Sequence, residues 1–184
     1  MNSLTNTRVV DARIGNVIPV IAATAVIALA AQIAVPVPFT PVPLTLQPLA
    51  VLLVGALLGS SRGAAAAALY LLEGMSGLPV FSQGHGGAIW LIGPTAGYLW
   101  SYPAAAFLSG WLAERGWTRT VARSIAAMLV SLVVIYIGGW SWLAIASGPQ
   151  AAFAMGVAPF ILADAVKIAI GAAVLPYLQE LIKR

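Results

Sequence analysis

The sequence predicts an all-α integral membrane protein, in which six transmembrane helices enclose a ligand pocket capped by an external Pro-rich loop and a Gly-rich loop. Of the 184 residues, 61% are hydrophobic and only 8% are charged, and the mean hydropathy is +0.97. Soluble chains carry about 25% charged residues. Two uncharged runs, 14–61 and 124–163, are long enough to hold spans in a lipid bilayer. We therefore exclude a soluble protein and expect a single membrane domain over residues 1–184.

The expected helices follow from the apolar stretches and from the residues that interrupt them. Alternating prolines at 36–43 cannot continue a helix because each lacks a backbone N–H, and the Gly-rich stretch 74–97 favours an ordered loop. Ser60–Gly63 is expected to be the hinge of a pair of short helices. Ser147–Pro149 is expected to separate the last two spans. The six helices are expected at 14–35, 48–60, 63–75, 96–113, 121–146 and 151–181.

The basic residues predict the orientation. Eight of the nine fall on the side of the termini in a six-helix topology, and they are Arg8, Arg13, Arg62, Arg115, Arg119, Arg123, Lys183 and Arg184. The positive-inside rule then makes both termini cytoplasmic. Residues this thinly spread do not form a nucleic-acid surface. Ala28–Ala30 resembles a signal cleavage site, but we expect the first span to be retained.

One pair of charges lies inside an expected span. Asp164 and Lys167 are three residues apart, so they share a helix face. Each charge costs about 2.5–3.5 kcal/mol at the bilayer centre, so the pair should face the protein interior. It either fixes helix register or forms part of a polar ligand site, and we favour the ligand site. Asp164 would accept N–H donors and Lys167 would hold a carboxylate or carbonyl oxygen, whereas Glu73 is expected to be a solvated helix end.

The segment 81–90 mixes polar and aromatic groups on a backbone that can approach a ligand closely. Gln83 can both donate and accept, and we favour it over His85, which we expect to bond to the backbone. The aromatic residues of this region line a pocket or form an interfacial belt. They are Trp90, Tyr98 and Trp100.

Catalytic arrangements are lacking. Ser76 or Ser82 near His85 has no nearby acid to orient the imidazole, and no P-loop occurs. The chain is therefore not expected to be an enzyme, and neither a cofactor nor a metal is expected.

Four motifs resemble the BioY family, the biotin-binding S components of energy-coupling factor (ECF) transporters. They are Val37–Gln47, Leu71–Phe81, Gly93–Leu99 and the Asp-x-x-Lys pair at 164–167. The resemblance covers nearly the whole chain. One departure is Ala96, where glycine is expected.

The resemblance implies high-affinity biotin capture near the external face of a bacterial or archaeal cytoplasmic membrane. The S component would then dock on a membrane coupling subunit driven by two ABC-type ATPases. The polar contacts implied are Asp164, Lys167 and Gln83, and the implied wall or lid positions are Thr45, Phe81, Trp90 and Tyr98. A homo-oligomer, a facilitator that moves biotin or another small molecule alone, and a structural membrane subunit are the alternatives.

Overall fold

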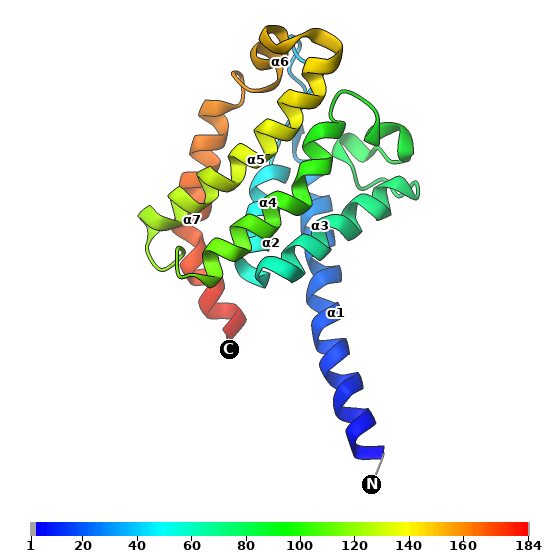
Figure 1. Cartoon of the computed structure of the whole chain (residues 1–184), viewed down its shortest axis with the longest axis vertical. Helices are drawn as coiled ribbons and strands as arrows, with labels where there is room; N and C mark the ends of the chain where they lie inside the picture. Colours follow the sequence, from blue (N-terminus) through cyan, green and yellow to red (C-terminus); the bar gives the residue numbers. More distant parts are fainter. Residues whose placement is uncertain (1–2, 184) are drawn as a thin grey trace.

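The structure is a computed structural model that describes residues 3–183, a range with seven α-helices and one small antiparallel sheet (Figure 1). The helices are α1 (Ser3–Gln32), α2 (Gln47–Leu58), α3 (Ser60–Met75), α4 (Ala96–Glu114), α5 (Val121–Ser147), α6 (Pro149–Gly156) and α7 (Ile161–Lys183). Arg184, one of the residues used to predict orientation, lies outside the described residues. The beginning of α1 and the end of α7 lie toward the same end of the molecule (Figure 1).

The first helix begins earlier and ends earlier than predicted. It ends at Gln32 because the chain then forms β1 (Ala34–Val35), which pairs antiparallel with β2 (Leu44–Thr45). This pairing closes the Pro-rich segment 36–43 into a compact loop, which we call the proline flap. The prediction of a non-helical loop here is confirmed, but the two short strands were not predicted.

The short hairpin of α2 and α3 turns at Gly59, one residue before the predicted hinge. Gly59 has φ +85°, a left-handed conformation that glycine adopts without steric cost. Gly63 therefore lies inside α3, where a Cβ would come within 2.7 Å of the Gly55 Cα. Glycine at these two positions lets α2 and α3 pack closely.

Small residues also set the contact between α4 and α5. A Cβ on Gly138 would lie 2.7 Å from the Gly97 carbonyl oxygen, and a Cβ on Gly139 would overlap the ring of Tyr98. The core around these helices includes Tyr102, which is 4% exposed. Side chains of α4 and α5 together form one side of the pocket described below.

The predicted sixth helix over 151–181 is wrong, because the chain forms α6 and α7 with a turn between them. Pro159 disfavours helical backbone at Ala158, and Gly156 accepts a hydrogen bond from the Tyr98 hydroxyl on its carbonyl oxygen (2.6 Å). The count of six helices is corrected to seven within residues 3–183. As a result, Asp164 lies in the first turn of α7 rather than in the middle of a helix.

Within residues 3–183, two helices are long and apolar enough to cross a membrane, and they are α5 and the Ile161–Leu181 part of α7. Only 33% and 28% of their most apolar windows are buried within the protein, whereas a core helix of a soluble protein is mostly buried. Ile145 and Leu162 are 82% and 78% exposed. A broad apolar surface of this kind suits contact with lipid.

Candidate ligand pocket

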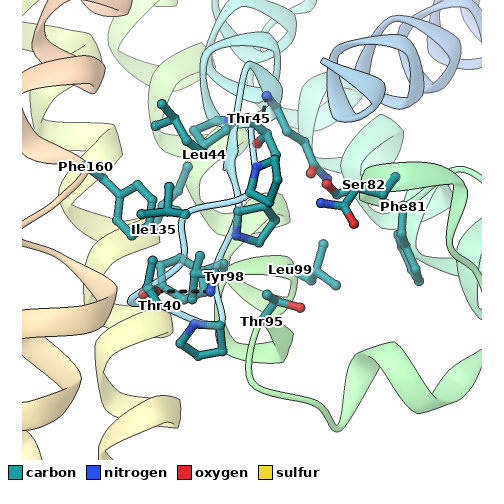
Figure 2. Close-up of a pocket in the computed structure, with 18 of the residues that line it drawn as sticks. Thr40, Leu44, Thr45, Phe81, Ser82, Thr95, Tyr98, Leu99, Ile135 and Phe160 are labelled. Carbon is teal, nitrogen blue, oxygen red and sulfur yellow. Dashed lines mark hydrogen bonds between the residues drawn. The ribbon is translucent and has the colours of Figure 1, made fainter. Parts of the chain in front are cut away.

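All seven residues predicted for the site line one cavity of about 220 Å³. They are Thr45, Phe81, Gln83, Trp90, Tyr98, Asp164 and Lys167. Figure 2 shows that the lining comes from the proline flap and β2, from the Gly-rich loop, and from α4, α5 and the turn before α7. The structure thus brings together residues that are up to 122 positions apart. The volume lies below the roughly 300–1,000 Å³ of pockets for drug-sized ligands, which suits a small metabolite.

Asp164 and Lys167 form the predicted ion pair. The Lys167 Nζ lies 2.6 Å from the Asp164 Oδ1 and donates a second hydrogen bond to the Thr45 carbonyl oxygen at 2.7 Å. Asp164 is only 4% exposed. The first turn of a helix stabilises negative charge, so the break before α7 places this carboxylate where the helix favours it.

Tyr136 completes the polar cluster and was missed in the sequence. Its hydroxyl donates to the Asp164 Oδ2 at 2.6 Å, across the contact between α5 and α7. A lone tyrosine in a long apolar run carries only a weak signal, because belt tyrosines occur in the same context. Tyr136, Asp164 and Lys167 are called the polar cluster below.

The polar cluster keeps unused hydrogen-bonding capacity. Each carboxylate oxygen of Asp164 accepts one bond in the structure, and a carboxylate has about four lone-pair sites. The Lys167 ammonium has three donors and uses two of them. A ligand could therefore bond to both groups without breaking the ion pair, so a structural role for the pair does not exclude ligand binding.

Aromatic side chains form the pocket walls. Tyr98 is 7% exposed, so it lies in the core and not in an interfacial belt. Trp100, by contrast, is 53% exposed and lies outside the cavity lining. The Trp90 ring lies against the His85 ring, with 4.0 Å between ring centroids, and Phe81 packs edge-on against Tyr70 at 5.6 Å.

Gln47 is a second pocket residue that the sequence did not single out as a contact. Its side-chain amide donates to the Tyr70 hydroxyl at 2.7 Å, and that hydroxyl donates to the Val80 carbonyl oxygen at 3.0 Å. The chain of bonds joins the start of α2 to α3 and to the Gly-rich loop. Gln47 thereby links these elements beside the pocket that it lines.

The Gly-rich loop contains two short 3-10 helices, Ser82–Gly84 and Ala88–Leu91. Gln83, in the middle of the first of them, has φ +62°, an unusual conformation for a residue other than glycine. His85 bonds to the backbone as predicted, with its Nδ1 2.7 Å from the Ser82 carbonyl oxygen. Glu73 is not simply a solvated helix end, because its Oε1 accepts a hydrogen bond from Thr24 in α1 at 3.0 Å.

Fold and pocket together define a class, namely a helical membrane protein with a pocket lined by polar and aromatic side chains near one end of the bundle. Residues 2–184 match the BioY family, and the chain belongs to that family. It is 41% identical over 139 residues to the probable biotin transporter BioY of Pyrococcus horikoshii, covering 76% of this chain and 82% of that protein. It is 36% identical over 159 residues to the biotin transporter BioY of Thermotoga maritima, covering 86% and 92%.

A solved structure has the same fold. The crystal structure of the S component for biotin from an ECF-type ABC transporter superposes with a TM-score of 0.81 at 25% sequence identity. The match covers 95% of this chain and 94% of that one. The all-helical fold is therefore that of an ECF S component, which is an integral membrane protein.

Proposed function

We propose that this chain captures biotin and delivers it for uptake as the substrate-binding S component of an ECF-type transporter. The observation that carries the proposal is the polar cluster, which lies in a pocket of a BioY-family chain. The relatives named above are biotin transporters, and the similar solved structure is a biotin S component. This function is binding and transport, not catalysis.

The bicyclic head of biotin suits the polar cluster. Its ureido group has two N–H donors and one carbonyl oxygen, and the free acceptor sites of Asp164 match an N–H donor. The Lys167 Nζ and the Asp164 Oδ1 are 2.6 Å apart, so both groups would contact the same end of a ligand. We assign the ureido oxygen to Lys167, because a ligand carboxylate there would lie beside the Asp164 carboxylate and be repelled.

The rest of the ligand matches the walls. The sulfur-containing ring is apolar and would pack against Tyr98 and Phe81, which are largely buried. The valerate tail would extend beneath the proline flap toward Gln83, which is exposed and can donate to a carboxylate. Thr45 and Trp90 complete the enclosure.

Transport is proposed to need a partner. In this account the chain docks on a membrane coupling subunit driven by two ABC-type ATPases, with both termini in the cytoplasm of a bacterial or archaeal cell. Support for this orientation comes from basic residues at or beside the α2–α3 turn and the α4–α5 connector, which lie toward the same end of the molecule as the start of α1 and the end of α7 (Figure 1). They are Arg62, Arg115, Arg119 and Arg123. Uptake that persists without the ATPases would support a facilitator, and a homo-oligomer would then be expected.

The test is calorimetry of the purified chain in lipid nanodiscs with biotin, biotin methyl ester and 2-iminobiotin, an analogue whose ureido oxygen is replaced by nitrogen. The proposal predicts near-stoichiometric biotin binding and a smaller loss for the ester than for an analogue with an altered ureido group. If the folded chain produces no binding heat with biotin, the proposed ligand is wrong. If the ester loses far more affinity than the ureido analogue, Lys167 instead holds the carboxylate.

A further inference from the structure

One side chain at the end of α1 forms hydrogen bonds with the Gly-rich loop. Gln32 is the last residue of α1. Its Oε1 accepts a hydrogen bond from the Gly84 N–H at 2.8 Å, and its Nε2 donates to the Phe81 carbonyl oxygen at 3.1 Å. The second Nε2 proton is donated to the Ala28 carbonyl oxygen of the same helix at 3.1 Å. The amide therefore bridges the two ends of one tight turn while it stays anchored on α1.

The turn that Gln32 bridges is the one that carries Gln83. Phe81 and His85 pair across it, with the Phe81 N–H donating to the His85 carbonyl oxygen at 2.9 Å. Gln83 occupies left-handed backbone, which carries a steric cost for a residue other than glycine. A conformation with that cost persists only where the surroundings hold it.

The other hydrogen bonds of the turn are internal to it, because the Phe81 N–H bonds to the His85 carbonyl oxygen and the His85 Nδ1 lies 2.7 Å from the Ser82 carbonyl oxygen. Within the described residues, Gln32 is the only side chain from outside the turn that forms hydrogen bonds with residues 81–85. The neighbouring Ser82 hydroxyl is buried and makes no hydrogen bond. The next hydrogen bond that joins this loop to a helix comes from Gly87, whose N–H donates to the Gly74 carbonyl oxygen of α3 at 2.7 Å. The Gln32 amide is thus the side chain whose bonds reach both Phe81 and Gly84.

We infer that Gln32 is a positioning residue for ligand binding, which holds the 81–85 turn in the conformation that presents Gln83 to the pocket. The inference rests on the proposed function. It assigns no ligand contact to Gln32 itself. Without these bonds the turn would sample other conformations, and the apparent dissociation constant would rise in inverse proportion to the fraction of molecules that keep the competent one.

The test compares Gln32→Met with Gln179→Met. Methionine has nearly the same length and helix propensity as glutamine but no amide. Gln179 is the matched control because its amide bonds only to the Thr118 hydroxyl, in the region around the α4–α5 connector. Amide hydrogen exchange over 80–88 and biotin affinity are measured on the same nanodisc samples.

Gln32→Met is expected to accelerate exchange at Gly84 and weaken biotin binding about tenfold, which is the scale of one or two net hydrogen bonds. Gln179→Met should change neither. Gln83→Ala should weaken binding in the wild type but have much less effect in the Gln32→Met background, because the turn is already displaced. That coupling would not follow from a general loss of stability.

Unchanged exchange in Gln32→Met would show that the turn holds itself, and the inference would be overturned. Faster exchange with unchanged biotin affinity would also overturn it, since the turn would then be irrelevant to the ligand. If the wild type binds no biotin, the proposed function fails and the positioning role fails with it. The exchange data would still show separately whether Gln32 orders the turn.

Discussion

The two ends of the bundle each contain a hollow, and the smaller one has the features of a binding site. The pocket beneath the proline flap has about 220 Å³. The other hollow has about 600 Å³ and lies between the α2–α3 turn, the α4–α5 connector and the end of α7. We call it the junction hollow. Its charged lining residues are Arg62, Glu114 and Arg119, and all three are exposed.

The difference lies in how the polar groups are arranged. In the pocket, Asp164 is almost completely buried and three polar groups converge on one point. In the junction hollow, the Glu114 carboxylate is already bonded to the backbone N–H and hydroxyl of Ser60. Volume alone would select the wrong end, whereas burial and convergence of polar groups select the pocket.

The largest expected effect is at Asp164. We expect Asp164→Asn to reduce biotin affinity about 100-fold or more, because losing one partner of a buried charged contact costs about 2–5 kcal/mol. Calorimetry of the variant in nanodiscs measures the loss. If the variant is less stable but its folded molecules bind biotin with wild-type affinity, the polar cluster is only structural.

Lys167→Met tests how much the ion pair contributes to the stability of the protein, as distinct from biotin affinity. It leaves a buried carboxylate without its cation, so thermal stability should fall, by about 3–5 kcal/mol in the unfolding free energy. The double variant Asp164→Asn with Lys167→Met should recover much of that stability but none of the affinity. Recovery of binding as well would mean that the two charges serve only each other.

Tyr136→Phe tests the member of the polar cluster that the sequence did not reveal. Removing the hydroxyl leaves Asp164 Oδ2 without its donor, and one charge-assisted bond is worth about 1.5–3 kcal/mol. We expect biotin affinity to fall about tenfold or somewhat more, while the chain stays folded. Equilibrium binding with labelled biotin measures this, and an unchanged affinity would remove Tyr136 from the site.

Charge removal in the junction hollow should leave ligand binding intact. The double variant Arg62→Ala with Arg119→Ala is expected to bind biotin within about twofold of the wild type, because exposed charges contribute little at a distance in salt. The measurement is again calorimetry at physiological ionic strength. A large loss of biotin affinity would contradict the contrast between the two ends.

The smallest expected effect is the pH response of Glu114. Hydrogen bonds from the Ser60 backbone N–H and hydroxyl lower the pKa of Glu114 below its ordinary value of 4.5. A lowered pKa contributes stability above that value, and the contribution is lost as the pH falls through the folded-state pKa. Ser60→Ala should therefore narrow the difference in melting temperature between neutral and acidic pH without altering biotin affinity at neutral pH. An unchanged pH response would mean that the bonds from the Ser60 hydroxyl have no measurable weight.

Much of the fold follows from local patterns in the sequence. Alternating prolines predicted the flap, and the spacing of three predicted the Asp164–Lys167 pair, because both depend only on nearby residues. The break before α7 also had a local signal, since Gly156 and Pro159 flank it, but the long apolar run outweighed that signal. Because the structure ends α6 at Gly156 and begins α7 at Ile161, Asp164 lies in the first turn of α7.

Contacts between distant elements could not be predicted in this way. The bond from Tyr136 to Asp164 and the bond from Gln47 to Tyr70 depend on how α2, α3, α5 and α7 pack. Gln32 likewise has no special pattern around it, and its importance comes from reaching a turn 52 residues away. The substrate-contact roles of the predicted site residues remain predictions.

The most direct test of the central claim is an experimental structure of this chain with biotin bound in nanodiscs. The account predicts the ureido group within hydrogen-bonding distance of Asp164 and Lys167, beneath the proline flap, with the valerate carboxylate directed toward Gln83. Biotin bound in the junction hollow, or bound in the pocket with its carboxylate on Lys167 and its ureido group away from Asp164, would contradict the account.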